Sequence, residues 1–497
     1  MIYNSTRDNT QSVEAAYAIA HGISKEGGLF VPQCVPALTK EDFKALKGMN
    51  YVERAKYILG LFLTDFSEEE LDYCAKGAYV GSFDNNLPAP LKALDDKVNI
   101  LELWHGPTCA FKDLALQILP YLLTTSSKKV GDGKKTVILV ATSGDTGKAA
   151  LEGFKDVEGT EIMVFYPNDG VSAMQQRQMN TQKGKNVYVC AINGNFDDAQ
   201  TGVKTIFTND NIKALLNDNN MEFSSANSIN WGRLAPQIIY YISAYCDLMD
   251  KGEDYLKEGF NVVVPTGNFG NILAAYYARQ MGAPIAKLIC ASNSNNVLSD
   301  FLKTGTYNRN RDFYTTISPS MDILISSNLE RMLYELTNHN DKQVAEWQNA
   351  LKNEGKYTVS EEVLAKLKDL FYGGYCSEEK TASTIKKVFD EYGYLIDTHT
   401  AVAVSVYEDY KQQTGDNRPT VIASTASPYK FANSVLEALG ESVPQNEFDA
   451  ADKLANKTNT GIPTPIAALK TAEIRFNNVC EKDDMNKVVL NHLGINK

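Results

Sequence analysis

The stretch that decides the fold is LWHGPTCAFKD, residues 103–113, because it places a lysine between a buried strand and a helix. The apolar run 98–104 predicts a strand, and after the His-Gly-Pro-Thr break the amphipathic run 110–123 predicts a helix. Lys112 would then lie in or beside the first helical turn, where the helix dipole disfavours a cation. A lysine in that position, next to apolar Phe111, is typical of an amine that acts as a nucleophile.

The rest of the sequence falls into three regions. Residues 1–92 carry amphipathic runs and predict a mainly helical N-terminal domain. Residues 93–440 alternate apolar strands with helices, which predicts an α/β core of two lobes, each a parallel sheet covered by helices. Residues 441–497 form a polar C-terminal tail that packs on this core. The expected N-terminal helices are 13–23, 40–47, 51–63 and 68–79; the expected core strands are 98–104, 136–142, 161–166, 186–192, 261–265, 287–291 and 420–424.

Composition excludes several classes of protein. The chain has 497 residues and a net charge of -12, which opposes binding to the phosphates of nucleic acids. No apolar run is long enough to span a bilayer, and the first residues lack the apolar core of a signal peptide, so we expect a cytoplasmic protein. The eight cysteines form no Cys-x-x-Cys pair and no histidine stands at metal-ligand spacing, so we expect neither a disulfide scaffold nor a metal site.

The loops after the predicted strands are where we expect function, since open parallel sheets bind ligands beyond the carboxyl ends of their strands. Residues 141–148 bring glycines and hydroxyl groups to the start of a helix, where backbone N–H groups would hold an anion such as a carboxylate. The alternative is an ordinary Gly-Asp turn with a helix cap. The spacing of a Walker loop is absent.

A second loop, residues 264–271, also runs from a strand into a helix. Gly267 and Gly270 would let the backbone close around a phosphate, and Asn268 and Asn271 would add side-chain donors. The alternative is a plain glycine-rich turn. The full dinucleotide-binding fingerprint is missing, which argues against an NAD-dependent oxidoreductase.

A third loop, residues 424–431, places the hydroxyl of Thr425 at a strand end, where a simple cap is the alternative role. In combination, the three loops and Lys112 are the parts that a pyridoxal phosphate site needs. The lysine anchors the cofactor covalently, the glycine loop binds its phosphate, and a neutral hydroxyl faces the pyridine nitrogen. The sequence therefore predicts a pyridoxal phosphate enzyme.

The motifs resemble the threonine synthase family, in the subgroup found in many bacteria and fungi. That family has the tryptophan-synthase-β-like fold, or fold type II, of pyridoxal phosphate enzymes. The resemblance implies the conversion of O-phospho-L-homoserine and water into L-threonine and phosphate, the last step of threonine biosynthesis. It also implies a small-molecule substrate, no metal, and a monomer or homodimer. The matching motifs are at 3–7, 27–32, 104–108, 110–113, 141–147, 228–233, 267–271, 318–322, 327–331 and 397–402.

The resemblance also assigns roles to single residues. Lys112 carries the cofactor, acts as the base in catalysis, and lies opposite Thr425, which faces the pyridine nitrogen. The chain departs from the family at residues 425–431, where the family usually reads Thr-Ala-His-Pro-x-Lys-Phe. This chain has Ser427 in place of the histidine and Tyr429 after the proline. The cofactor phosphate is assigned to Gly267, Asn268, Phe269, Gly270 and Asn271, and the substrate carboxylate to Ser143, Gly144, Asp145 and Thr146.

A substrate phosphate needs a cation nearby. Arg233 is the first choice, because it follows a polar loop at a helix start and arginine grips phosphate with two parallel bonds. Asn230 is its neutral partner, and the alternative for Arg233 is a surface ion pair. For His105 and His399 we expect structural hydrogen bonds. Other candidates for the substrate phosphate are Lys148, Arg177, Lys183, Asn227 and Arg331.

Two other hypotheses about the function remain open at this point. The first is a threonine or serine dehydratase, which would share the cofactor and differ in substrate. The N-terminal region and residues 300–400 favour threonine synthase by resemblance. The second is a catalytically silent binding protein, against which Lys112 argues, since a pure binder has no use for a reactive lysine.

Overall fold

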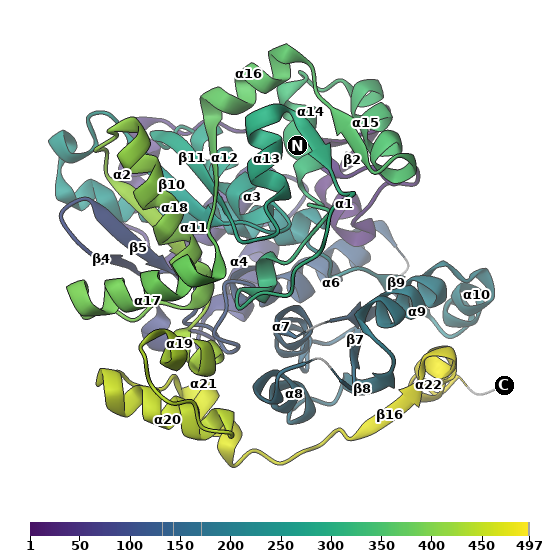
Figure 1. Ribbon diagram of the computed structural model, residues 1–497. Coiled ribbons are helices and arrows are strands. Elements are labelled where there is room, and N and C mark those ends of the chain that lie inside the picture. Colours follow the sequence, from purple (N-terminus) through teal and green to yellow (C-terminus); the bar gives the residue numbers. More distant parts are fainter. Residues whose placement is uncertain (132, 143, 170, 496–497) are drawn as a thin grey trace.

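Two parallel β-sheets form the framework of the molecule (Figure 1). The computed structural model describes residues 1–131, 133–142, 144–169 and 171–495. One sheet has the order β14-β11-β10-β15-β5-β4, with β4 alone antiparallel, and the other has the order β16-β8-β7-β6-β9. Their strands are β4 Leu91–Ala93, β5 Val98–Glu102, β6 Lys135–Ala141, β7 Thr160–Pro167, β8 Val187–Asn193, β9 Met221–Ser224, β10 Phe260–Pro265, β11 Ile285–Ser292, β14 Phe371–Tyr375, β15 Thr420–Ser424 and β16 Asn478–Glu481.

The central strands are apolar on both faces because helices cover both sides of each sheet. Every residue of β7 and of β10 is buried, as expected for the inner strands of a parallel sheet. In the first lobe, whose sheet contains β10, α12 and α18 pack on the sheet. In the second lobe, whose sheet contains β7, α7 and α9 do so. The prediction of two parallel-sheet lobes is confirmed. These helices are α7 Asp145–Phe154, α9 Phe196–Thr208, α12 Gly270–Gln280 and α18 Thr398–Thr414.

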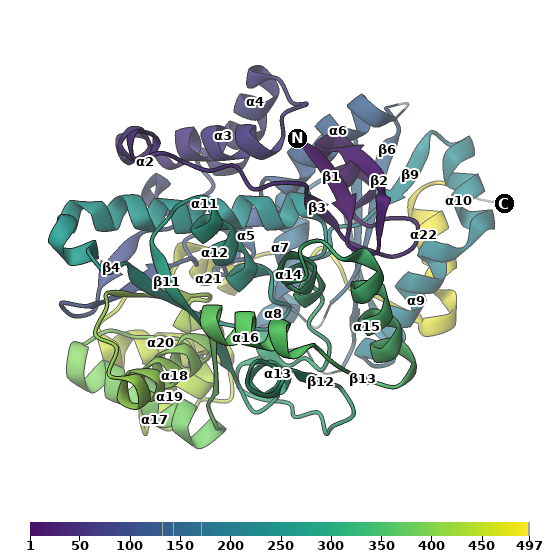
Figure 2. The ribbon, with the colours of Figure 1, turned by 90° about the horizontal axis from the view of Figure 1, so that it is seen from above.

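Helix α11, Trp231–Leu248, joins the N-terminal helices to the core (Figure 2). It packs against α2, α3, α5 and α12, and nearly all of its residues are buried. A helix that is apolar all round has to lie inside the protein. No helix in the described ranges is both long enough and apolar enough to cross a membrane. The neighbouring helices are α2 Lys40–Lys47, α3 Tyr51–Phe62, α4 Glu68–Tyr79, α5 Asp113–Leu116 and α6 Leu119–Val130.

The first residues differ from the prediction. A three-stranded antiparallel sheet, β2-β1-β3, forms here, and α1 lies between β2 and β3 in the chain. The helix expected at 13–23 spans Ala15–His21 (α1). The polar strand β2 has the alternating burial of an edge strand, which apolar periodicity does not reveal. The helix expected at 110–123 is divided between α5 and α6, with Pro120 in the first turn of α6. The strands are β1 Ile2–Ser5, β2 Asp8–Glu14 and β3 Phe30–Pro32.

The C-terminal segment connects the two lobes. After α20 (Glu447–Thr458) and α21 (Thr464–Ala467) the chain runs along the molecule, and β16 pairs in parallel with β8 of the second lobe (Figure 1). Four strands of the two sheets, β4, β9, β14 and β16, were not predicted from the sequence. The domain boundaries predicted after residues 92 and 440 stay a prediction. The remaining helices and the small sheet β12-β13 are α8 Ala173–Asn180, α10 Asp210–Asp218, α13 Val297–Thr304, α14 Leu329–Leu336, α15 Asp341–Asn353, α16 Glu361–Leu370, α17 Glu378–Tyr392, α19 Ala432–Ala438, α22 Met485–His492, β12 Thr306–Asn308 and β13 Lys356–Thr358.

The contact of α5 with α7 depends on Gly153, whose added Cβ would lie 2.0 Å from the backbone oxygen of Leu116. We therefore expect Gly153→Ala to force the two helices apart and to lower the free energy of unfolding by about 1–3 kcal/mol. Chemical denaturation measures this change. Gly461→Ala is the matched control, since a Cβ there meets nothing within 4 Å. Equal stability of the two variants would contradict the close packing of α5 on α7.

Candidate active site

Lys112 lies where the chain leaves β5 and enters α5, as the sequence predicts. The preceding residues pair with the segment after β15: the N–H of Phe111 donates to the oxygen of Thr425 at 2.8 Å, and Ala110 bridges to Ala426. This pairing sets Thr425, which is buried, beside the lysine. Cys109 adopts a left-handed backbone with φ 55°, a conformation that costs a non-glycine residue free energy and is common at functional sites.

The turn before Lys112 is fixed by the buried carboxylate of Asp113. This carboxylate accepts hydrogen bonds from the backbone N–H of Thr108 at 2.8 Å and from its hydroxyl at 2.6 Å. Gly106 has to be glycine, since a Cβ there would lie 2.5 Å from Asp113 Oδ2. Burial raises the pKa of Asp113 to about 6, although both hydrogen bonds oppose the shift.

The amine of Lys112 lies in a weakly solvated environment. Its Nζ atom is 3.3 Å from Ser320 Oγ and 4.9 Å from the ring centre of Phe111. Burial lowers its pKa to about 8, with further lowering by Lys430 and Arg233. A lysine with this pKa keeps a sizeable neutral fraction near pH 7, which nucleophilic attack requires.

The 267–271 loop follows β10 and begins α12. Phe269 has a left-handed backbone with φ 65° and stands directly before the helix. Gly267 lies against the segment that carries Ser320, and a Cβ on it would be 2.7 Å from the Ser320 oxygen. Asn268 accepts the N–H of Asn328 on its backbone oxygen at 3.0 Å. The loop is thus held against the neighbourhood of the Lys112 amine.

The N-terminus of α12 fits an anionic group. Asn271 is buried, its Oδ1 accepts the hydroxyl of Tyr241, and its Nδ2 has no hydrogen-bond partner among the described residues. Buried donors are normally paired, and the first N–H groups of a helix lack acceptors within it. A phosphate with several acceptor oxygens would satisfy these donors. The residues at this loop therefore fit the phosphate of pyridoxal phosphate.

The turn at the start of α7 is the predicted carboxylate site. Ser143 lies outside the described residues. Gly144 has φ 147° and ψ -97°, and the hydroxyl of Thr142 accepts its N–H at 3.0 Å. The first N–H groups of α7, at Asp145 and Thr146, have no acceptor within the helix. The Asp145 carboxylate itself forms an ion pair, so an anion at this turn would bind to backbone N–H groups and the Thr146 side chain.

Arg233 is a buried cation whose charge lowers the pKa of Lys112. Its Nη1 donates to the oxygen of Ala226 at 2.9 Å, whereas its Nε has no hydrogen-bond partner among the described residues. Burial alone lowers its pKa to about 10, and no carboxylate contributes, so it is not in the surface ion pair considered from the sequence. Asn230 caps α11 and donates both amide hydrogens to Ile19 and Ser225, so its amide positions this helix start.

The other candidate cations are engaged elsewhere. Arg331 is fully buried and donates to the oxygens of Phe30 and Ile229 and to Asn328. Lys148 pairs with Glu152, on its own helix. Arg233 thus differs from these two cations, because its Nε has no hydrogen-bond partner among the described residues. For Lys183, and for the neutral partner Asn227, the described part of the chain shows no hydrogen bond or ion pair with Lys112.

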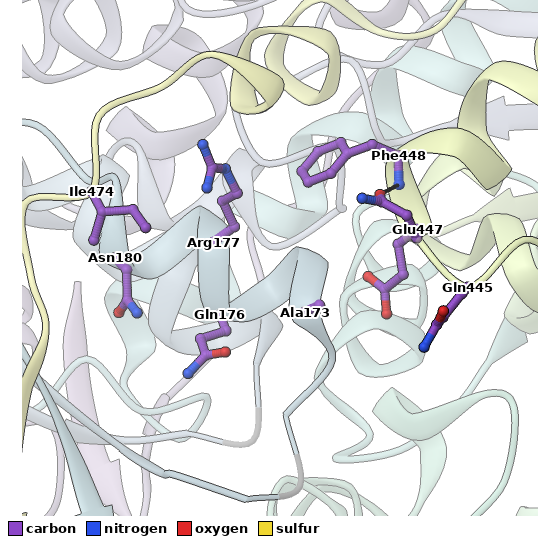
Figure 3. A pocket seen from close by; sticks show the side chains of 9 residues that line it. Ala173, Gln176, Arg177, Asn180, Gln445, Glu447, Phe448 and Ile474 are labelled. Atoms are coloured by element: carbon purple, nitrogen blue, oxygen red, sulfur yellow. Dashed lines mark hydrogen bonds between the residues drawn. The ribbon is translucent and has the colours of Figure 1, made fainter.

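Arg177 lines a cavity of about 530 Å³ between α8 and the start of α20 (Figure 3). Its guanidinium donates to backbone oxygens of Leu469 and Ala472, at 2.7 and 2.9 Å. Glu447, also at this cavity, accepts the N–H of Met174 at 2.6 Å. These side chains join the C-terminal segment to the second lobe. The guanidinium of Arg177 is thus used to hold that segment, and we do not assign a phosphate to it. Among the described residues no group of histidine, cysteine and acidic side chains is arranged to hold a metal.

The two histidines form the structural hydrogen bonds expected from the sequence. His105 stacks on Trp104 and lies 2.8 Å from Glu102. His399 pairs through Nδ1 with Asp397 at 2.7 Å, and its Nε2 accepts the N–H of Ser320 at 3.1 Å. His399 thereby fixes the segment that contacts both Lys112 and Gly267.

Comparisons with known proteins agree with this site. Family models match residues 2–79 (threonine synthase N terminus), 85–426 (pyridoxal-phosphate dependent enzyme) and 400–489 (threonine synthase, C-terminal). A threonine synthase of Pseudomonas aeruginosa is 37% identical over 88% of this chain and 90% of its own length. The chain belongs to the threonine synthase family.

Two further relatives of this family are informative. A crystal structure of PLP-bound threonine synthase from Brucella melitensis superposes with a TM-score of 0.88, at 36% identity and 99% coverage of both chains. The human threonine synthase-like 1 is 40% identical over 87% of this chain, and the chain spans only 59% of the length of that protein. The predictions of a fold type II α/β enzyme and of pyridoxal phosphate as its cofactor are confirmed.

Sequence reasoning missed three residues of this threonine synthase site. Ser320 and Lys430 lie far from Lys112 along the chain, so no local pattern connects them to it. Asp113 follows Lys112 directly, but the sequence does not indicate that its carboxylate accepts hydrogen bonds from Thr108. Ser427 stands where the last motif of the family usually has histidine. Its hydroxyl oxygen accepts the N–H of Tyr429, and its own N–H donates to the backbone oxygen of Cys109. Its side chain caps the short helix η5, Pro428–Phe431.

We expect His399→Ala to weaken cofactor binding, because the segment that carries Ser320 loses the acceptor of its N–H. Loss of one such hydrogen bond is worth about 1 kcal/mol, or roughly a fivefold rise in the dissociation constant of pyridoxal phosphate. Absorbance titration with the cofactor measures this value. His21→Ala, at an exposed position, is the control. An unchanged affinity in His399→Ala would remove His399 from the support of the site.

Proposed function

We propose that this protein converts O-phospho-L-homoserine and water into L-threonine and phosphate. The observation that carries the proposal is that a half-buried lysine of lowered pKa lies among separate anion-binding groups. These groups are the α12 start with Asn271, the α7 start with Thr146, and the guanidinium of Arg233. The cofactor and substrate together present two phosphates and one carboxylate, so three groups are needed.

We propose a separate role for each residue of the site. Lys112 would hold pyridoxal phosphate, residues 267–271 would bind its phosphate, and Thr425 would face its pyridine nitrogen. When bound, the cofactor supplies an electron sink for the charge left at Cα of the substrate. Lys112 is the base that we propose for the Cα proton, and its lowered pKa makes the amine suitable.

The substrate-binding groups orient the leaving group. Arg233 would bind the phosphate of O-phospho-L-homoserine, and the N–H groups of Asp145 and Thr146 would bind the carboxylate, beside Gly144. Loss of a Cβ proton and cleavage of the Cγ–O bond release phosphate, and Cγ gains a proton. The hydroxyl group of water then adds at Cβ, and return of a proton to Cα gives threonine. A dehydratase substrate has no phosphate, so it would leave the buried charge of Arg233 without an anion.

Incubation of the purified protein with pyridoxal phosphate and O-phospho-L-homoserine tests the function directly. We expect threonine and phosphate in equal amounts, and no product from Lys112→Ala. The same protein given threonine alone measures the rival activity. Release of ammonia from threonine, without threonine formation from O-phospho-L-homoserine, would contradict the proposal in favour of a dehydratase.

Arg233→Ala tests the substrate phosphate site. A charged hydrogen bond is worth about 1.5–3 kcal/mol, so we expect kcat/KM for O-phospho-L-homoserine to fall about 10- to 100-fold. The visible absorbance of bound cofactor is expected to stay the same. Arg309→Ala is the matched control, because Arg309 donates to the oxygen of Lys352 on the surface. Unchanged kinetics in Arg233→Ala would exclude Arg233 from the site.

We further propose that the protein acts in the cytoplasm as a monomer or homodimer, on a small molecule, and binds no nucleic acid. The net charge of -12 supports the last point, since phosphate backbones repel an acidic protein. Light scattering of the purified protein measures the number of chains.

A further inference from the structure

Lys430 is a buried lysine that the proposed reaction does not use. Its side chain is 1% exposed, and its Nζ lies 2.7 Å from Asp145 Oδ1 and 2.9 Å from the oxygen of Thr108. Asp145 begins α7 in the second lobe, and Thr108 belongs to the turn before Lys112. Lys430, in η5, therefore connects its own loop to the start of α7 and to the turn before Lys112.

The partner of Lys430 stands where a carboxylate is unexpected. Asp145 lies in the turn that is proposed to bind the carboxylate of the substrate, and an unpaired negative charge there would repel that anion. Burial would raise the pKa of Asp145, yet Lys430 and then Lys112 hold it well below its usual range. Asp145 is thus ionised and needs a permanent counter-cation.

Lys112 is the competing cation for this carboxylate. The charged groups that act on its amine are Asp145 from α7, Lys430 from η5, Arg233 from α11 and Asp113 from α5. Asp145 is the group that most favours the ammonium form, whereas Lys430 opposes it. An ion pair between Lys112 and Asp145 would hold the proton on the amine and remove its reactivity.

We propose that Lys430 is a positioning residue that occupies Asp145, so that this carboxylate does not bind the Lys112 ammonium and the amine stays free to react with an aldehyde. The geometry supports this role, since one nitrogen contacts both Asp145 and the turn that leads to Lys112. The proposal rests on the proposed function in one respect only, that Lys112 is the residue that captures pyridoxal phosphate.

The rate of cofactor capture by the full-length chain freed of pyridoxal phosphate tests the proposal. The neutral amine attacks the aldehyde carbon, a C=N bond replaces the C=O bond, and the oxygen leaves as water. Stopped-flow absorbance after mixing with pyridoxal phosphate follows this step across pH. In the unchanged protein we expect the rate to rise with pH to a midpoint of about 8.

Opposite shifts of this midpoint are the expected signature. Lys430→Gln removes the cation, so the midpoint is expected to rise by about one pH unit and the rate at pH 7 to fall about tenfold. Asp145→Asn removes the group that favours the ammonium form, so its midpoint is expected to fall. Lys430→Arg keeps the charge and is expected to keep the midpoint.

The double variant Lys430→Gln with Asp145→Asn is expected to lie between the two single variants. If Lys430→Gln alone does not fold, the double variant replaces it in the test. The midpoint of the double variant is then expected to be higher than that of Asp145→Asn. Circular dichroism and thermal melting confirm that each variant is folded. Shifts in the same direction, or no shift in either single variant, would overturn the proposal.

This experiment is independent of the overall reaction. Capture is measured without O-phospho-L-homoserine, so a protein that makes no threonine still gives a midpoint for Lys430. A protein whose capture rate is the same in Lys112→Ala would instead refute the assignment of Lys112, and with it the proposed function.

Discussion

The backbone pairing of residues 109–111 with residues 425–427 is the constraint on which the site depends. The N–H of Ser427 donates to the oxygen of Cys109 at 3.0 Å, and the N–H of Phe111 donates to that of Thr425 at 2.8 Å. Because β5 and β15 are adjacent parallel strands, their loops leave the sheet at one edge and can pair in this way. The pairing brings Lys112, Thr425 and Lys430 together, although most of the chain separates them in sequence.

Much of this arrangement could be predicted from the sequence because each part is local. Each apolar strand is followed within a few residues by its own turn, and Lys112 follows β5 in the same way. Periodicity and turn chemistry therefore indicate each of these parts. Arg233 was found in the same way, since it stands one turn into a helix after a polar loop. In a parallel sheet such local features become neighbours without further information.

Other features could not be predicted because they depend on distant partners. Ser320 is 208 positions from Lys112, and Lys430 is 322 positions from Thr108. No periodic pattern encodes which buried lysine pairs with which carboxylate, since side-chain pairing is decided by packing. The strand β2 was missed for a related reason, because it is a polar edge strand whose only signal is its pairing with β1.

The charges of the site explain how an acidic protein can accept anions. Three cations, Lys112, Arg233 and Lys430, and two carboxylates, Asp145 and Asp113, carry the charge of the site, and burial raises the pKa of Asp113 to about 6. The net charge of -12 belongs to the whole surface, where salt screens charges over roughly 8 Å. Buried groups are screened far less, so the local surplus of positive charge decides what binds. Lys430 and Asp145 neutralise each other, which leaves Arg233 as the cation without a carboxylate. An anion that pairs with Arg233 therefore gains an interaction that the protein itself does not supply.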